Sequence, residues 1–373
     1  MRVAVVGVGG VGGILAAALE SAGQASVTLV SQGSGLAALR RHGLTVRTLE
    51  GRLHHFAIPQ ERLLSVDEAA ASGEAHDVVF VTTKAQKMTS ALDSLARLVG
   101  PSTLVVPCMN GLPWWFFHAA AAPGGKHTGL RLWSTDPTGR LSREISFPKV
   151  LGCVGSIAGQ VHKNQASWHC QWPSEKNRLV LGDPAHPGNG PSDRVKTVAG
   201  LFQDAEIPVT VTHDADIRSK IFDHLLIHSS INAIAALSRG DCGQVVDDHS
   251  GEELLRDVVE EATAVANALD PPLRLSLNAD DIIDMYRGQY GLRPSMLQDA
   301  DSGRSIEKDS VVGALVELAS QVGVETPSLK VILHLLDVMD SAASQRAGFG
   351  AFYDLSSADL PDRIRNMNYE IAP

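Results

Sequence analysis

Cysteine is scarce in this 373-residue sequence, and its four copies are widely scattered. Cys108, Cys153, Cys170 and Cys242 form no C-x-x-C pair and do not approach the density of a disulfide scaffold. We therefore expect reduced thiols that mostly pack in the interior, because free cysteine commonly behaves as a small buried hydrophobe. Cys108 is the one with a possible further role, since it lies at a predicted strand end beside Asn110.

Long apolar runs, excess positive charge and internal repeats are also missing. No uninterrupted stretch of about 18 apolar residues occurs, and the N-terminal MRVAVVGVGG is too short and glycine-broken for a signal peptide. We therefore expect a cytoplasmic protein without a membrane partner. The formal net charge of −10 argues against a nucleic-acid partner. No repeat period is visible, and the length suggests two domains.

The first residues carry a pattern typical of dinucleotide-binding proteins. Residues 2–6 read as a buried strand, GVGGVG at 7–12 matches G-x-G-x-x-G, residues 14–22 look helical, and SVTLV at 26–30 reads as a second strand. The N-terminus of such a helix offers free N–H groups and a positive dipole end to phosphates. The pattern indicates a binding site for NADP or NAD, although a strand-to-helix turn without a ligand would use similar residues.

Four glycines of this loop are candidate cofactor-binding residues. Gly7 would make the tight turn, Gly9 would allow close approach of a pyrophosphate, and Gly12 would allow close packing of helix on strand. Gly10 belongs to the same loop.

The end of the second strand should distinguish NAD from NADP. An acidic residue there would bind the ribose 2′-hydroxyl, and an arginine would accommodate a 2′-phosphate. The sequence instead has Ser31 and Gln32, which we take as cofactor-binding candidates. Arg40 and Arg41, in the next predicted helix, could reach a phosphate, but a solvated helix face explains them equally well. The choice of cofactor stays open.

Two further predicted strands end in polar residues. Residues 77–84 and 103–111 read as parallel core strands with a helix at about 86–98 between them. In an open α/β sheet the ligand lies beyond the carboxyl ends of the strands. Lys84 and Asn110 should therefore face the cofactor. A lysine at a strand end and an Asn-Gly turn are also common where they only end a strand or form a turn.

The remaining pattern predicts a change from α/β to all-α structure near residue 212. Short strands are expected at 149–159, 177–183 and 207–212, with a helix at about 194–205. Helices are then expected at about 214–238, 250–268, 278–288, 303–322 and 327–344. We accordingly expect a dinucleotide-binding domain over 1–212, a helical substrate and dimerisation domain over 213–346, and a C-terminal tail over 347–373.

One predicted helix carries an unusual series of polar residues. In IFDHLLIHSSIN, residues 221–232, His224, His228 and Asn232 recur every four residues on an otherwise apolar segment. The two histidines could be a metal pair, but no third ligand is visible in the sequence. They could also be structural histidines without chemistry.

The sequence resembles the ketopantoate reductase family, the NADPH-dependent 2-dehydropantoate 2-reductases, over nearly its whole length. The motifs that carry the resemblance are GVGGVG, VTTKAQ, MNG, LVLGDP, ADIRSKIFDHLLIHSSINAIAAL and PSMLQDADSGRSIEKD, in that order. The resemblance implies a Rossmann domain followed by an all-α domain like that of 6-phosphogluconate dehydrogenase. It also implies hydride transfer to a small 2-oxo carboxylate, and a homodimer.

The resemblance assigns roles along the polar helix. Ile217-Arg218 and INAIAAL at 231–237 fix the register, in which His224 stands where the family has its proton-donating lysine. His228 takes the place of a first substrate-binding asparagine, and Asn232 that of a second. The resemblance further implies catalytic roles for Asn110 and Glu307, with Ser295 near the substrate carboxylate. Gln32 replaces the usual arginine for the 2′-phosphate.

Histidine in place of lysine changes the acid–base chemistry. A lysine, with an ordinary pKa of about 10.4, needs tuning to give up a proton at neutral pH, whereas imidazole, at about 6.5, needs little. At pH 7 an unperturbed His224 would be about three-quarters neutral, and competent as base or acid. We hypothesise that it is the acid/base and that oxidation runs more readily than is usual in the family. Two alternatives are an imine or opine-like oxidoreductase and a catalytically inactive dinucleotide-binding sensor.

Overall fold

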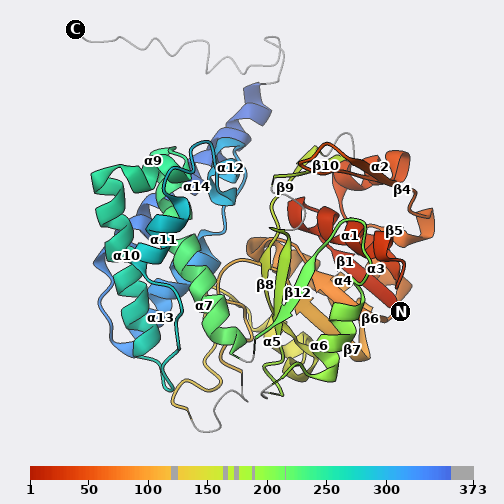
Figure 1. Cartoon of the computed structure of the whole chain (residues 1–373), viewed down its shortest axis with the longest axis horizontal. Coiled ribbons are helices and arrows are strands. Elements are labelled where there is room, and N and C mark those ends of the chain that lie inside the picture. Colours follow the sequence, from red (N-terminus) through yellow and green to blue (C-terminus); the bar gives the residue numbers. More distant parts are fainter. Residues whose placement is uncertain (119–124, 163–166, 172–175, 187–189, 215, 354–373) are drawn as a thin grey trace.

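The computed structural model describes the chain except residues 119–124, 163–166, 172–175, 187–189, 215 and 354–373. An α/β unit formed by the N-terminal half stands beside an all-helical unit formed by the C-terminal half (Figure 1). This arrangement confirms the predicted fold class.

A five-stranded parallel sheet forms the centre of the N-terminal unit. Its order is β5-β2-β1-β6-β7, so the chain order reverses between β1 and β6. Such a reversal defines the crevice in which dinucleotides bind. The strands are β1 (Arg2–Val6), β2 (Ser26–Val30), β5 (Leu63–Leu64), β6 (His76–Val81) and β7 (Val99–Pro107). The helices of this unit are α1 (Gly10–Ala22), α2 (Gly33–His42), α3 (Val66–Ser72), α4 (Met88–Leu98), α5 (Arg140–Glu144) and α6 (Asp193–Gly200).

The two faces of β1 belong to two different apolar cores. Val3 and Val5 pack with α1, whereas Ala4 and Val6 pack with α4. The second core continues from α4 through Trp114 and into the C-terminal helices. The two units therefore share one core.

Two smaller sheets flank the parallel one. The strands β3 (Leu44–Arg47), β4 (Leu53–Phe56), β9 (Gly159–His162) and β10 (Ser167–Cys170) form a four-stranded sheet, and β8 (Gly152–Ser156), β11 (Arg178–Gly182) and β12 (Thr210–His213) form a three-stranded one. The first of these sheets was not predicted. It joins segments more than a hundred residues apart in sequence, through the parallel pairing of Trp168 with Val46, and local periodicity carries no signal for such a pairing. Three short turns, η1 (Gln60–Arg62), η2 (Ala85–Lys87) and η3 (Phe147–Lys149), link these elements.

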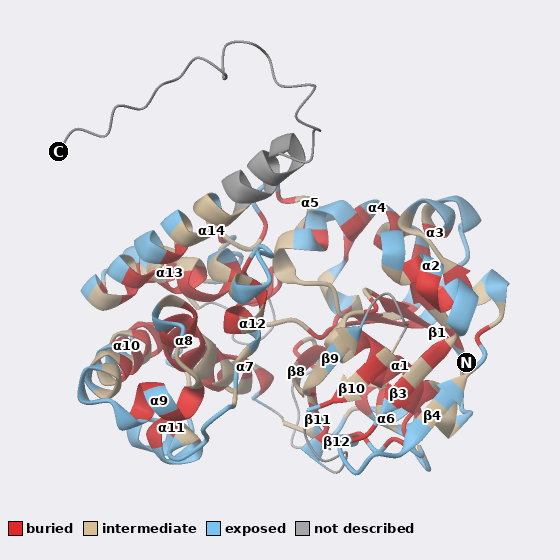
Figure 2. Ribbon diagram, turned by 90° about the horizontal axis from the view of Figure 1, so that it is seen from above, coloured by how far each residue is buried: buried red, intermediate tan, exposed pale blue. Residues whose placement is uncertain are grey.

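The C-terminal unit is a helical bundle, with its buried residues gathered where helices meet (Figure 2). Its elements are α7 (Ile217–Ile227), η6 (His228–Asn232), α8 (Ala233–Ser238), α9 (Cys242–Asp247), α10 (His249–Asn267), α11 (Ala279–Tyr286), α12 (Ser295–Asp301), η7 (Asp309–Gly313), α13 (Ala314–Val322) and α14 (Pro327–Tyr353). The short helices α9 and α12 were not predicted. The helix expected over 303–322 was placed too early, because residues 302–307 form a loop and the helical turns begin at Lys308.

The segments α7, η6 and α8 form one continuous helix with a π-helical turn in its middle. By length and composition alone this helix could cross a membrane, but most of it is buried within the bundle, as expected for the core helix of a globular domain. Single π-helical turns inside α-helices occur frequently at functional sites. Here the turn begins at His228 and ends at Asn232.

The last helix extends farther than expected. We predicted an end near residue 344 and a tail from 347, whereas α14 continues to Tyr353. The remainder of the predicted tail, 354–373, lies outside the described residues.

Candidate functional site

The glycine loop lies between β1 and α1, at the crevice where the sheet order reverses. Gly7 has φ +100°, and a Cβ there would lie 2.6 Å from Thr83 Cγ2. A Cβ on Gly12 would lie 2.2 Å from the Gly7 carbonyl oxygen. At Gly9, by contrast, nothing lies within 4 Å of the Cβ position. The loop therefore combines close internal packing with an open approach at Gly9, which fits a bound pyrophosphate.

Two further glycines of the loop meet the four-stranded sheet. A Cβ on Gly10 would lie 2.1 Å from the Gly159 carbonyl oxygen, and one on Gly13 would lie 2.0 Å from Trp168 Nε1. The Trp168 indole also donates a hydrogen bond to the Gly9 carbonyl oxygen at 2.8 Å. Packing against this sheet explains why the sequence has more glycines than G-x-G-x-x-G requires, and Trp168 is a supporting residue that the sequence did not reveal.

At the ribose end of the crevice, Ser31 follows β2 and Gln32 is the N-cap of α2. Arg40 is engaged elsewhere, because its Nη2 donates to the Glu68 carboxylate at 2.6 Å and to the Leu63 carbonyl oxygen at 3.0 Å. The hydrogen bond from Arg40 is the main cause that lowers the pKa of Glu68 to about 2. These contacts leave Gln32 as the residue at the strand end that can select a cofactor.

Lys84 joins the two units through an ion pair with Asp299 of α12. Asp299 is buried, and it also accepts a hydrogen bond from Arg304 Nε at 2.9 Å. Our sequence analysis did not single out Asp299. The available signal was its position four residues after Ser295, which places both on one face of a helix.

Glu307 is buried beside the end of β6, in the contact between the units. Its carboxylate accepts hydrogen bonds from the Ala85 backbone N–H and from Asn110 Nδ2, both at 3.2 Å. Burial raises the pKa of Glu307, while nearby Lys84 and the two hydrogen bonds oppose that rise. The structure thus brings three residues singled out from the sequence, Lys84, Asn110 and Glu307, into one cluster.

The turn that carries Asn110 is fixed by the second π-helical turn, η7. Gly111 has φ +84°, and a Cβ there would lie 2.2 Å from the Ser310 carbonyl oxygen. The same oxygen accepts a hydrogen bond from the Leu112 N–H at 2.9 Å. Since η7 also contacts η6, the cluster around Glu307 lies next to the turn that carries His228.

His224, His228 and Asn232 form a chain of side-chain contacts along the helix. The two histidine Nε2 atoms are 3.2 Å apart, and Asn232 Nδ2 lies 2.7 Å from His228 Nδ1. The rings lie edge to face, with centroids 4.3 Å apart. Both ring nitrogens of His228 therefore have partners within the chain.

The environment of this chain keeps both imidazoles neutral. Both histidines are half-buried residues of the helix. Desolvation lowers the pKa of His224 to about 4. Burial, together with the neighbouring His224, lowers the pKa of His228 well below its ordinary value.

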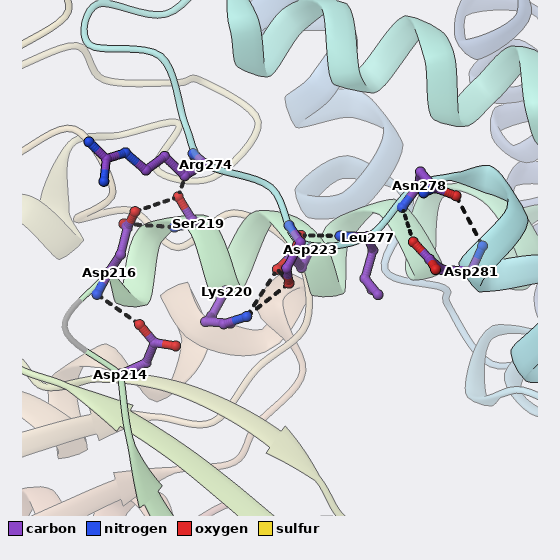
Figure 3. Close-up of polar contacts among 10 residues, drawn as sticks. Asp214, Asp216, Ser219, Lys220, Asp223, Arg274, Leu277, Asn278 and Asp281 are labelled. Atoms are coloured by element: carbon purple, nitrogen blue, oxygen red, sulfur yellow. Dashed lines mark hydrogen bonds and ion pairs between the residues drawn. The ribbon is translucent and has the colours of Figure 1, made fainter.

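Lys220, one turn before His224, cannot stand in for the missing lysine. Its Nζ donates to Ser276 Oγ at 2.8 Å and pairs with Asp223 at 3.5 Å (Figure 3). The Asp223 carboxylate in turn accepts from the Ser276 and Leu277 N–H groups. Lys220 thus holds the loop before α11 and is not free to act at the position of His224.

Ser295 is exposed at the first turn of α12, four residues before Asp299.

All four cysteines are free and buried, and the Cys108 and Cys153 sulfurs lie 3.5 Å apart. Among the residues that the structure describes, no group of three or more histidine, cysteine, aspartate or glutamate residues is placed to hold a metal ion.

Comparison with known proteins identifies the family. Residues 3–113 match the family model for ketopantoate reductase PanE/ApbA, and residues 216–340 match the model for its C-terminal domain. A 2-dehydropantoate 2-reductase of Mesorhizobium japonicum is 33% identical over 90% of this chain and 97% of its own length. The chain belongs to the ketopantoate reductase family. It is therefore an oxidoreductase that uses NADP or NAD.

Solved structures agree with this assignment. A protein of Ralstonia solanacearum described as a ketopantoate reductase has a TM-score of 0.80 and 30% identity, covering 91% of this chain and 98% of its own. D-mandelate dehydrogenase, solved with NADH and anilino(oxo)acetate, has the same fold at a TM-score of 0.73 and 15% identity, covering 92% and 100%. The dimeric ketopantoate reductase of Staphylococcus aureus has a TM-score of 0.66 and 19% sequence identity, and the match covers 92% of this chain and 100% of its own.

Proposed function

We propose that this enzyme interconverts a small 2-oxo carboxylate and the corresponding 2-hydroxy carboxylate, with His224 as the acid/base. The observation that carries the proposal is the chain from His224 to Asn232, whose turn η6 contacts η7, the segment that begins two residues after Glu307. His224 occupies the lysine position of the family, and no other ionisable residue of α7 is free to replace that lysine.

The cofactor would lie along the glycine loop, with Ser31 and Gln32 at the ribose and Lys84 and Asn110 at the inner strand ends. NADP or NAD, when bound, supplies or accepts the hydride. The open approach at Gly9 and the N-terminus of α1 suit the phosphates.

His224 gives a proton to the carbonyl oxygen during reduction and takes it back during oxidation. Its low pKa leaves it neutral at rest, when it donates a hydrogen bond to that oxygen. It gives up a proton only after taking one from solvent, and it then returns to the neutral form. Asn110 and Glu307 act on the hydroxyl side of the substrate. Ser295, His228 and Asn232 line the substrate side, and Ser295 is exposed where it can meet a carboxylate.

The decisive experiment follows nicotinamide absorbance with NADH and NADPH against a panel of 2-oxo acids. The same panel is then run with added amine, and in reverse with 2-hydroxy acids. We expect turnover with 2-oxo acids alone. Turnover that requires amine would replace this proposal with an imine or opine-like reaction. Cofactor binding without turnover under any condition would favour the sensor.

We further propose a homodimer formed through α14. Val331, Leu335 and Val338 are 51–68% exposed and recur at helical spacing along one face of α14. Val331 and Leu335 also line an apolar groove of about 400 Å³, together with residues of α8 and α10. Exposed apolar patches of this kind mark interaction sites, and the dimeric Staphylococcus aureus enzyme with the same fold supports a second copy as the occupant.

Light scattering after gel filtration tests this interface. We expect a dimer for the wild type, a monomer for Leu335→Glu, and a dimer for the control Lys196→Glu, which changes an exposed residue of α6 in the N-terminal unit. A monomeric wild type would refute the proposal.

A cytoplasmic location is likewise proposed, and the four free, buried cysteines suit a reducing compartment.

A further inference from the structure

We propose that Asn232 and His228 form a directional hydrogen-bond chain that selects the tautomer of His224, so that His224 meets the substrate through Nδ1. The chemical meaning of this inference rests on the proposed role of His224 as acid/base, but the tautomer itself can be observed without turnover. His228 is, on this view, a positioning residue.

The contact between the two histidines requires one donor and one acceptor. Their Nε2 atoms are 3.2 Å apart, and a neutral imidazole has one protonated and one unprotonated nitrogen. Two protonated Nε2 atoms would repel each other, and two unprotonated ones would make no hydrogen bond. One histidine must therefore carry its proton on Nε2 and the other on Nδ1.

The contact with Asn232 determines which of the two histidines is protonated on Nε2 and which on Nδ1. Its Nδ2 lies 2.7 Å from His228 Nδ1, and an amide nitrogen can only donate. His228 Nδ1 is then the acceptor, so His228 carries its proton on Nε2 and donates it to His224 Nε2. His224 is left with its proton on Nδ1, the ring nitrogen that the chain does not use.

This arrangement presents an N–H donor to a substrate carbonyl oxygen without a net charge. The arrangement is also reversible. If the Asn232 amide rotates so that its oxygen accepts from His228 Nδ1–H, every bond in the chain reverses and His224 Nδ1 becomes an acceptor. The first direction can donate a hydrogen bond to a ketone oxygen and the second can accept one from an alcohol. Both contain the same number of protons, so the reversal reorients the chain, and the proton that reduction consumes comes from solvent.

The π-helical turn places the three residues for this purpose. His228 is its first residue and Asn232 its last, and His224 lies one helical turn earlier. The wider turn changes the stacking of side chains at the point where the histidines meet. Both ring nitrogens of His228 are occupied inside the chain, so its ring nitrogens are not available to a substrate.

Nitrogen NMR of protein labelled with ¹⁵N-histidine tests the inference, because protonated and unprotonated ring nitrogens have distinct shifts. The His224 signals are assigned by their loss in His224→Gln. We expect Nδ1 of His224 to be protonated in the wild type. In Asn232→Asp the carboxylate can only accept, so we expect the proton of His224 to move to Nε2.

A second variant and a control keep the test decisive. His228→Phe keeps a ring but removes both hydrogen bonds, and should leave His224 as a mixture of tautomers even if Asn232→Asp fails to fold. Ser230→Ala removes a buried hydrogen bond to the Leu226 carbonyl oxygen in the same turn and should leave the tautomer unchanged. A wild-type His224 protonated on Nε2, or a tautomer that neither variant changes, would overturn the inference.

Kinetics separate positioning from substrate binding. If turnover is found, we expect His228→Phe to lower kcat roughly fivefold or more, since a hydrogen bond of about 1 kcal/mol is lost, while KM for the 2-oxo acid stays near that of the wild type. A raised KM with unchanged kcat would mean that His228 binds substrate instead. Absence of all turnover with the NMR pattern intact would refute the proposed function and leave the chain standing.

Discussion

The two sides of the candidate site differ in how they are built. On the N-terminal side, close backbone approach at the glycines and charged contacts such as that of Lys84 with Asp299 hold the residues in place. On the C-terminal side, the helix from α7 to α8 presents two neutral imidazoles and one amide. The first side is held by backbone packing and ion pairs, and the second by hydrogen bonds between neutral side chains.

The difference separates two tasks. Fixed charges and glycine packing set geometry, since their protonation or conformation does not change during the reaction. Neutral imidazoles with low pKa values can gain and lose protons in place. If His224 is the acid/base, as we propose, neighbouring residues must control where its imidazole proton lies.

The largest effect should come from His224→Ala. Positioned acid–base groups contribute roughly a hundred- to ten-thousand-fold in rate, so we expect kcat to fall by that factor while cofactor affinity, measured by nicotinamide fluorescence, is retained. The control His249→Ala removes an exposed histidine paired with Glu253 on α10 and should be silent. Unchanged turnover in His224→Ala would show that His224 is not the acid/base, and that the C-terminal side does not provide the proton transfer that we assign to it.

The complementary change, His224→Lys, sharpens the same point. It restores the residue that the family has at this position, and measurable reduction of ketopantoate would confirm the register of the helix. Because the lysine would be flanked by His228 instead of an asparagine, we expect a slower enzyme than the relatives. Loss of all activity together with normal folding would count against the assigned register.

The central parallel sheet and glycine loop of the N-terminal side could be predicted from the sequence. The glycine spacing, the strand ends at Lys84 and Asn110 and the parallel sheet all follow from local pattern, because a strand-loop-helix unit is a local structure. Trp168 escaped prediction because it reaches Gly9 through strands distant in sequence. On the C-terminal side the sequence identified the polar residues but did not predict the hydrogen bonds between them. Four-residue spacing aligned His224 with His228, yet the π-helical turn and the desolvation that lowers their pKa values depend on packing.

The second prediction concerns acid stability. The folded pKa of His224, about 4, lies below the unfolded value of about 6.5, so between these values the unfolded state binds the proton and the folded state does not. The free energy of unfolding should then fall by about 1.4 kcal/mol for each pH unit as pH drops through this window. Urea titrations from pH 7 to 4 should show a smaller loss for His224→Asn. Equal slopes would mean that His224 is solvated and that the C-terminal side is not desolvated.

The third prediction tests the packing of the N-terminal side. Gly13→Ala places a Cβ against the Trp168 indole, and overpacking of this kind costs about 1–3 kcal/mol. We expect that loss in urea unfolding, together with weaker cofactor binding. Gly200→Ala is the matched control, since nothing lies within 4 Å of its Cβ position. Equal stability of the two variants would show that the four-stranded sheet does not restrain α1.

The smallest effect is expected at Arg40. The Arg40 guanidinium already donates hydrogen bonds to Glu68 and to the Leu63 carbonyl oxygen. We therefore expect it not to bind the 2′-phosphate of NADPH. The ratio of kcat/KM for NADPH to that for NADH should change less than about twofold in Arg40→Ala, within the range of exposed ion pairs. In Gln32→Arg the ratio should rise about tenfold, since a hydrogen bond to a charged group is worth about 1.5–3 kcal/mol. A collapse of the ratio in Arg40→Ala would show that cofactor choice on the N-terminal side depends on a rearranged Arg40.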